Sequence, residues 1–106
     1  MHATVRRYDG VDQKRSDELT KKVGESLIPR LSKLPGFSGY YLIEAGNGVM
    51  SSIGLFDTST QAEESNRVAA SWLREEKLET AFPNPPQVTG GQVIAHTANG
   101  SAIVSA

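Results

Sequence analysis

Residues 36–57 constrain the fold of this chain more than any other segment. Two apolar runs flank Asn47-Gly48, and this dipeptide favours a tight type I′ turn because both of its residues readily adopt positive φ. The segment therefore predicts a β-hairpin. Counting outward from the turn gives the expected cross-strand pairs, which are Ala45 with Met50, Ile43 with Ser52, Leu42 with Ile53, Tyr41 with Gly54 and Tyr40 with Leu55.

Both faces of this hairpin are expected to be largely apolar. In the register above, one face carries Tyr40, Leu42, Ile53 and Leu55, and the other carries Tyr41, Ile43, Met50 and Phe56. An antiparallel sheet with one face in water alternates apolar and polar side chains, and this hairpin does not. Each of its faces therefore requires a cover.

Two helices are expected, one before the hairpin and one after it. The first follows a cap at Asp12 or Ser16, and its apolar stripe consists of Leu19, Val23, Leu27, Leu31 and Leu34. Pro29 has no N–H to donate to the carbonyl of Glu25, so this helix is expected to kink or break near residue 28. The second helix spans residues 61–77, and its inward stripe consists of Ala62, Ser65, Asn66, Ala69, Trp72 and Leu73.

Alternating side chains over residues 2–8 predict a first strand, and residues 87–97 predict a last one. The order strand, helix, strand, strand, helix, strand indicates an α+β, ferredoxin-like βαββαβ fold. In this fold an antiparallel four-stranded sheet carries both helices on one face. The length of 106 residues fits one domain, which we assign to residues 1–97. Residues 98–106 are small and uncharged, and we expect them to form a flexible tail.

The helices of such a fold cover only one face of the hairpin. An uncovered apolar face of this size usually marks an interface, and two sheets packed across a two-fold axis would bury it. We therefore expect a homodimer, with Tyr40, Leu42, Ile53 and Leu55 facing the partner. In the alternative arrangement, the last segment of the chain folds back over the sheet.

Composition excludes several classes of partner. With 11 basic and 12 acidic side chains and no basic stripe, the chain is not expected to bind nucleic acid. No apolar run approaches the roughly 20 residues that cross a membrane. The absence of cysteine fits a cytoplasmic protein, and two histidines far apart in sequence do not indicate a metal site.

At this level of detail the chain resembles a known family. Leu34-Pro-Gly-Phe-Ser-Gly-Tyr-Tyr-Leu, the Asn47-Gly48 turn, Ile53-Gly-Leu-Phe-Asp-Thr and the helix from Ala62 to Trp72 are similar to the antibiotic-biosynthesis monooxygenase family. The resemblance covers roughly residues 2–96 and rests on fold markers, none of which is a catalytic signature.

The resemblance implies a homodimer in which two sheets form a dimeric α/β barrel, with a small-molecule pocket between sheet and helices in each subunit. It also implies an oxygenase that acts on an aromatic polyketide or a quinol and needs no cofactor. Haem-degrading relatives use an Asn on the first strand, a Trp on the second helix and a His after that helix. Trp72 fits this pattern, but the first strand has no Asn and His96 comes too late, so haem degradation is disfavoured.

The candidate ligand site follows from spacing on the second helix. Asn66, Ala69 and Trp72 recur at intervals of three, and the small Ala69 leaves room beside a large ring. Across from them we expect Tyr41, Phe56 or His96. The alternative to a ligand-site role is a core role for Trp72 and a structural role for His96. Arg6 and Arg7 face opposite ways, so that one of the two is placed to meet an anionic substrate.

Two functions remain open on the sequence. The first is a cofactor-independent monooxygenase acting on an aromatic or quinol-type small molecule. The second is a small-molecule-binding or dimerisation module without catalysis, which the scarcity of acid–base residues favours slightly. A fold does not choose between them. No catalytic residue is assigned.

Overall fold

The computed structural model describes residues 1–98 and 101–104. The strands are β1 (His2–Tyr8), β2 (Phe37–Gly46), β3 (Val49–Phe56), β4 (Gln87–Gln92), β5 (Ala95–Ala98) and β6 (Ser101–Val104). The helical segments are a 3₁₀ turn (Gln13–Arg15), α1 (Ser16–Lys22), a π turn (Val23–Leu27), α2 (Ile28–Ser32) and α3 (Ser59–Glu75). No helix among the described residues is long and apolar enough to cross a membrane.

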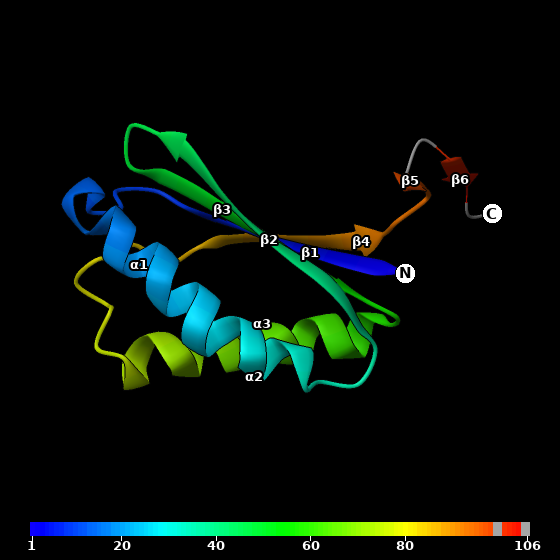
Figure 1. The fold of residues 1–106 in the computed structure, drawn as a ribbon, viewed down its shortest axis with the longest axis horizontal. Coiled ribbons are helices and arrows are strands. Elements are labelled where there is room, and N and C mark those ends of the chain that lie inside the picture. Colours follow the sequence, from blue (N-terminus) through cyan, green and yellow to red (C-terminus); the bar gives the residue numbers. More distant parts are fainter. Residues whose placement is uncertain (99–100, 105–106) are drawn as a thin grey trace.

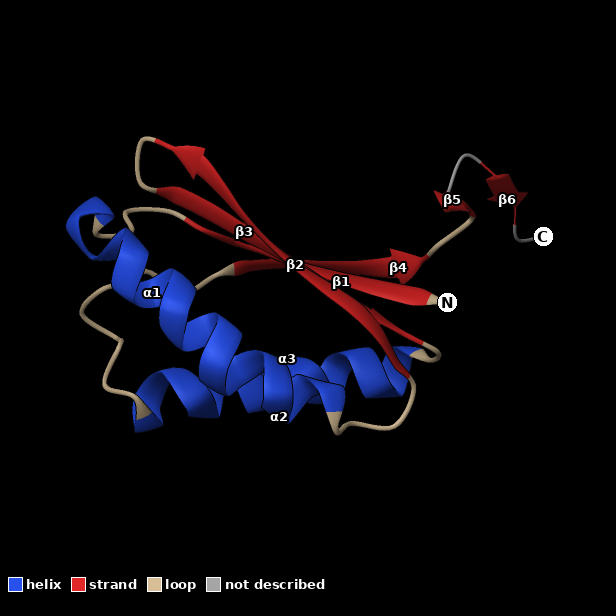
Figure 2. Cartoon of the chain, viewed as in Figure 1, coloured by secondary structure: helices blue, strands red, loops and turns tan. Residues whose placement is uncertain are grey.

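The predicted ferredoxin-like fold is confirmed. The main sheet has the order β2-β3-β1-β4 and all its neighbouring strands are antiparallel. Figures 1 and 2 show α1, α2 and α3 together on one side of this sheet, while its other side carries no helix. One face of the sheet is therefore covered within the chain, and we call the other its open face.

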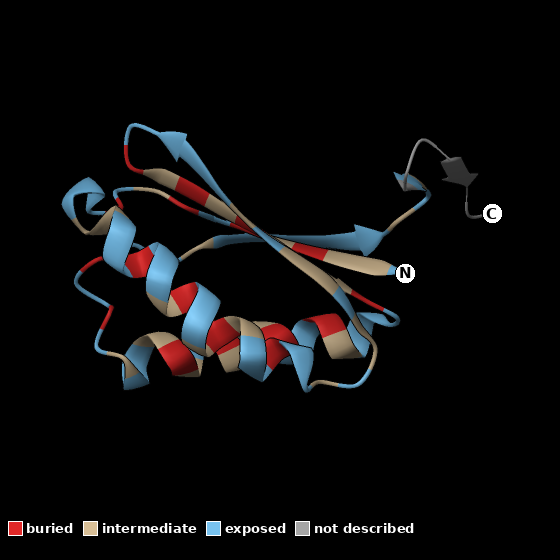
Figure 3. Cartoon of the chain, in the orientation of Figure 1, coloured by how far each residue is buried: buried red, intermediate tan, exposed pale blue. Residues whose placement is uncertain are grey.

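The core lies between the sheet and the helices. Figure 3 shows buried positions recurring along the helices and on strands of the sheet. The predicted stripe of α3 is confirmed, since Ala62, Ser65, Ala69 and Trp72 are buried and Asn66 and Leu73 are partly buried. The segment from the start of α1 to the end of α2 (Ser16–Ser32), which we call the first helical segment, buries Leu19, Val23, Leu27 and Leu31.

Near residue 28, where a kink or break is predicted, the structure has a π turn without a break. α1 ends at Lys22, the π turn covers Val23–Leu27, and α2 begins at Ile28 directly before Pro29. The backbone keeps right-handed helical angles on both sides of this turn. The chain therefore accommodates Pro29, which has no N–H to donate, with a wider helical turn just before it.

The predicted register of the hairpin is wrong by one residue. The turn forms as expected, with Asn47 and Gly48 at φ of 53° and 75° and Gly46 opposite Val49. A β-bulge then leaves Ala45 without a partner, so that Glu44 pairs with Met50. Because side chains alternate with a period of two, one extra residue moves the whole side-chain set of β2 to the opposite face relative to β3.

This shift corrects which residues face the open side. Tyr40 and Leu42 pack against the core under the helices, whereas the prediction placed them on a partner-facing surface. Ile53 and Leu55 share the open face with Tyr41 and Ile43 instead. Val5 pairs with Ile53, and Ala3 with Leu55, so β1 extends the same surface. We call this set the open-face patch: Ala3, Val5, Tyr41, Ile43, Ile53 and Leu55.

The predicted single strand over residues 87–97 is wrong. β4 ends at Gln92, and β5 instead pairs with β6 in a separate two-stranded sheet. Figure 1 shows this small sheet projecting away from the body of the fold. The predicted tail of residues 98–106 thus includes β6, while residues 99–100 and 105–106 lie outside the described part of the chain.

The start of α3 is fixed by a capping box, and removing it should cost measurable stability. The N–H of Gln61 donates to Thr58 Oγ1 at 3.3 Å, and the N–H of Thr58 donates to Gln61 Oε1 at 3.2 Å. We expect Thr58→Ala to lower the free energy of unfolding in urea by about 0.5–2 kcal/mol. Thr60→Ala, at an exposed position in the first turn of α3, is the matched control. Equal losses in both variants would show that the cap contributes nothing.

Candidate functional site

The buried polar side chains gather in one place. Over residues 1–97, for which burial is described, they are Thr4, Arg6, Ser52 and Ser65. β1 supplies the first two, β3 supplies Ser52, and α3 supplies Ser65 together with the partly buried Asn66. These five residues, which we call the polar cluster, lie between the sheet and α3 in a core that is otherwise apolar.

Arg6 is the centre of this polar cluster. Its Nε donates to Ser52 Oγ at 3.2 Å, and its Nη1 donates to the Ser65 carbonyl oxygen at 3.4 Å and to Asn66 Oδ1 at 3.3 Å. The Asn66 amide is held in turn by Thr4, because Asn66 Nδ2 donates to Thr4 Oγ1 at 3.1 Å. All three acceptors of the guanidinium are neutral.

The electrostatic position of Arg6 is therefore unusual. Its side chain is only 5% exposed, and it forms no ion pair with any carboxylate in the described part of the chain. Burying a charge is costly unless an opposite charge or strong hydrogen bonds compensate it. Tyr8 does not supply that charge, because burial raises the pKa of its phenol, although the positive charge of Arg6 acts in the opposite direction.

A small cavity lies beside Arg6, between the sheet and the helices. Its volume is about 20 Å³, and its aromatic walls are Tyr8, Tyr40, Trp72 and Phe82. A space of this size holds about one water molecule. An aromatic ligand would therefore have to displace part of the lining.

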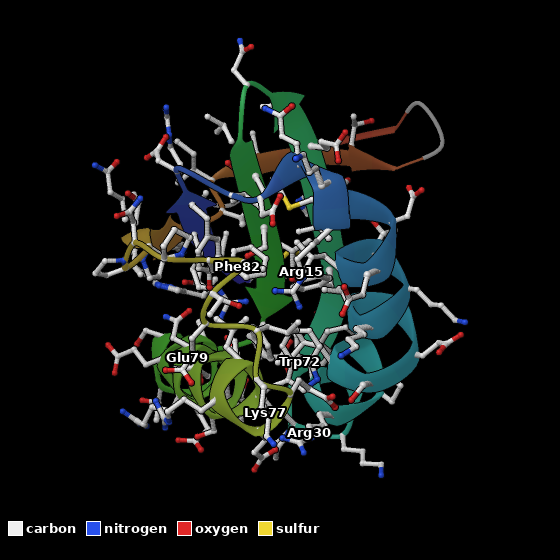
Figure 4. The ribbon with its side chains drawn as sticks, turned by 90° about the vertical axis from the view of Figure 1, so that its left-hand side faces the viewer. Arg15, Arg30, Trp72, Lys77, Glu79 and Phe82 are labelled. Carbon is white, nitrogen blue, oxygen red and sulfur yellow. The ribbon has the colours of Figure 1, made fainter. Side chains whose placement is uncertain are left out.

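The lining includes a side chain outside the helices and strands. Phe82 lies on the connector between α3 and β4 and contacts Tyr8 edge to face, with ring centroids 4.8 Å apart. Figure 4 shows Phe82 on this connector and Trp72 between α3 and the first helical segment. The wall formed by Phe82 is thus held by fewer backbone constraints than the wall formed by Trp72.

A wider groove lies on the other side of the polar cluster. It has a volume of about 370 Å³ and is lined by residues of β1, β4 and α3, among them His2, Thr4, Glu63, Asn66 and Val88. Thr4 and Asn66 belong to both the groove and the polar cluster. A further hollow of about 140 Å³, near the hairpin turn, shares no residue with the polar cluster.

The structure brings together only part of the predicted ligand site. Ala69 and Trp72 line the cavity beside Arg6, and Asn66 belongs to the polar cluster. Phe56 is buried on the same side of the sheet, but it packs edge to face on Phe37 and lines neither the cavity nor the groove.

The other two predicted site residues lie elsewhere. Tyr41 is 60% exposed on the open face, because the bulge at Ala45 turns it away from the helices. His96 lies on β5 in the separate small sheet, because the last strand ends at Gln92. No cluster of three His, Asp or Glu side chains that could hold a metal ion occurs among the described residues.

Trp72 belongs to the core as well as to the cavity wall. It is 1% exposed, and its Nε1 donates to Ser26 Oγ at 2.9 Å. Ser26 Oγ donates in turn to Glu76 Oε1 at 3.3 Å. The indole is thus fully satisfied within the chain, and a ligand would meet its ring and not its N–H.

Sequence reasoning missed Ser52, Tyr8 and Tyr40 as parts of this site. It separated Arg6 from Arg7 but did not decide which of them faces inward. The alternation of β1 contains the missing signal, since Thr4, Arg6 and Tyr8 share a face and all three are buried.

Comparison with known proteins shows a likeness of fold. No family model matches the sequence, and no curated protein matches it significantly. A solved structure from Bordetella bronchiseptica, provisionally assigned as an antibiotic biosynthesis monooxygenase, superposes with a TM-score of 0.69 at 19% identity. That match covers 88% of this chain and 96% of the other.

Two further solved structures extend this likeness. A dimeric ferredoxin-like protein from an uncultured marine organism has a TM-score of 0.67 at 15% identity, covering 93% of this chain and 92% of its own. A monooxygenase of Streptomyces coelicolor, in complex with the ligand nanaomycin D, has a TM-score of 0.63 at 18% identity, covering 98% and 92%. At these identities the likeness establishes the fold, and it agrees with the resemblance seen in the sequence. Another matched structure, from Nitrosomonas europaea, is a protein of unknown function.

Proposed function

We propose that this chain binds an aromatic small molecule between its sheet and α3, beside the polar cluster, and that it oxygenates a quinol-type ligand there without a cofactor. The observation that carries the proposal is the position of the polar cluster. The few buried polar side chains of the described core lie together, and they border a cavity with aromatic walls. Such a combination of apolar walls and a few convergent polar groups is typical of ligand sites.

The chemistry proposed needs little from the protein. A quinol or anthrone-like ligand that loses a proton supplies the electrons for its own oxygenation. Conversion of a CH₂ group to C=O consumes one O₂ and releases one water. The protein then has to orient the ligand, exclude water and stabilise its anion. The Arg6 guanidinium is suited to the last of these tasks.

A single tryptophan makes the proposal directly testable. Trp72 is the only tryptophan of the chain and lines the cavity, so its fluorescence should change when a ligand binds there. We expect dihydroxynaphthalene- or anthrone-like compounds to quench it saturably and to cause oxygen uptake above the rate without protein. Free N-acetyltryptophanamide controls for absorption by the compounds. A panel that produces neither saturable quenching nor oxygen uptake contradicts the proposal.

A specific observation also favours a non-catalytic binding module. Among the described residues, no carboxylate or imidazole lines the cavity beside Arg6, so none of these lining side chains is an ordinary general base near neutral pH. Saturable quenching of Trp72 without oxygen uptake would assign the chain to this second class.

We further propose that the chain forms a homodimer through its open-face patch. Six apolar residues from three adjacent strands make up this patch, and no helix in the described part of the chain covers it. Burial of such a patch against a second copy would remove it from water. The dimeric state of the marine ferredoxin-like protein supports this arrangement.

A further inference from the structure

We infer that the pocket beside the polar cluster selects an aromatic anion, and that Arg6 is the residue that recognises its charge. This inference rests on the proposed ligand site and names the class of ligand for it. It starts from the incomplete compensation of the buried Arg6 guanidinium.

A guanidinium has five N–H donors. In Arg6, Nε and Nη1 together donate three hydrogen bonds, to Ser52, Ser65 and Asn66. Its Nη2 donates none within the described part of the chain, although Arg6 is 5% exposed and lines the cavity. The side chain is therefore fixed in place by neutral acceptors, and its Nη2 keeps unused donor capacity.

No neighbouring group supplies the missing negative charge. The Tyr8 phenol faces the cavity, but burial raises its pKa and keeps it protonated near neutral pH. The remaining phenol in the lining belongs to Tyr40, and no carboxylate of the described residues lines the cavity. Glu63 lines the neighbouring groove together with His2, and it forms neither a hydrogen bond nor an ion pair with Arg6 among the described residues.

A ligand anion would complete this arrangement. Hydrogen bonds between a guanidinium and a carboxylate or enolate are charge-assisted and stronger than those to neutral acceptors. Apolar walls strengthen the attraction further, because the local dielectric is low. The walls formed by Tyr8, Tyr40 and Trp72 suit a planar ring, so the complementary ligand combines an aromatic body with one anionic oxygen group.

The first test compares two ligands of the same shape in the unmodified protein. Trp72 fluorescence is titrated with 2-naphthoate, which is an anion at pH 7, and with 2-naphthamide, which is its neutral counterpart. We expect the carboxylate to bind at least tenfold more tightly. Equal affinities would overturn the choice of an anion while leaving the pocket in place. Failure of both compounds to bind would overturn the pocket and this inference together.

The second test assigns the preference to Arg6. Arg6→Met should reduce the ratio of the two affinities to about one while 2-naphthamide still binds. Arg67→Met removes the same charge from an exposed position on α3, where Arg67 pairs with Glu64, and should leave the ratio unchanged. A ratio that persists in Arg6→Met would overturn the role of Arg6.

The stability of Arg6→Met separates recognition from a structural role. Replacing a buried charge that has no ion-pair partner by an apolar side chain of similar length removes the cost of burying that charge. We therefore expect the ligand-free variant to melt no lower than the unmodified protein. A clearly lower midpoint would show that the polar cluster exists to hold the fold. If Arg6→Met does not fold at all, that structural role is established, and the inference is overturned.

Discussion

Replacing Trp72 by alanine should lower the free energy of unfolding by about 3–5 kcal/mol, the largest single loss that this fold offers. The indole is 1% exposed and is the largest fully buried side chain of the core. Its removal loses apolar burial on α3 and leaves a cavity between α3 and the first helical segment, which cannot close because α3 also packs on the sheet. Urea denaturation followed by circular dichroism measures the effect, since the variant has no tryptophan.

Trp72→Phe separates the ring from its hydrogen bond. Phenylalanine keeps most of the apolar volume but cannot donate to Ser26 Oγ, so a loss of about 1–3 kcal/mol is expected. The matched variant Ser26→Ala removes the acceptor while leaving the ring in place. If Trp72→Ala unfolds at the same urea concentration as the unmodified protein, the ring is not part of the core.

A lysine in place of Ile53 should convert the proposed dimer into a monomer. Ile53 lies at the centre of the open-face patch, between Tyr41 on β2 and Val5 on β1. Packing a second sheet against this position would bury an unpaired ammonium, which costs several kcal/mol and shifts the association equilibrium by at least a hundredfold. Sedimentation velocity at micromolar concentration distinguishes the two states.

The control for this variant places the same charge away from the patch. Ala70→Lys lies at an exposed position of α3, on the opposite side of the molecule from the open face, and should remain a dimer. An unmodified protein that sediments as a monomer would contradict the dimer outright. A dimer that persists in Ile53→Lys would show that another surface forms the interface.

The order of the elements was predictable because each depends on local signals. Asn47-Gly48 identifies the turn, the spacing of leucines identifies the first helix, and Pro29 identifies the irregular turn within it. The register of the hairpin was not predictable in the same way. A bulge at Ala45 changes no side-chain pattern within either strand and alters only which strand positions meet.

The candidate site was predictable only in part for the same reason. Asn66, Ala69 and Trp72 were found because one helix presents all three. Arg6 and Arg7 are adjacent on β1 and therefore face opposite sides of the sheet. Which of the two faces inward is decided only when the helices cover one face of the sheet. Tyr41 was misplaced by the bulge, and His96 by the end of β4, which are both tertiary features.

The π turn between α1 and α2 has a consequence for the phase of the helix. Leu19, Val23, Leu27 and Leu31 recur every four residues, and an α-helix with 3.6 residues per turn would rotate each successive member by about 40° away from the sheet. Three such steps would spread the four side chains over about 120° of the helix surface. The wider turn at Val23–Leu27 winds more slowly over the middle step and narrows that spread, and all four side chains are buried. One wide turn thus brings a four-residue repeat closer to a single line along the helix.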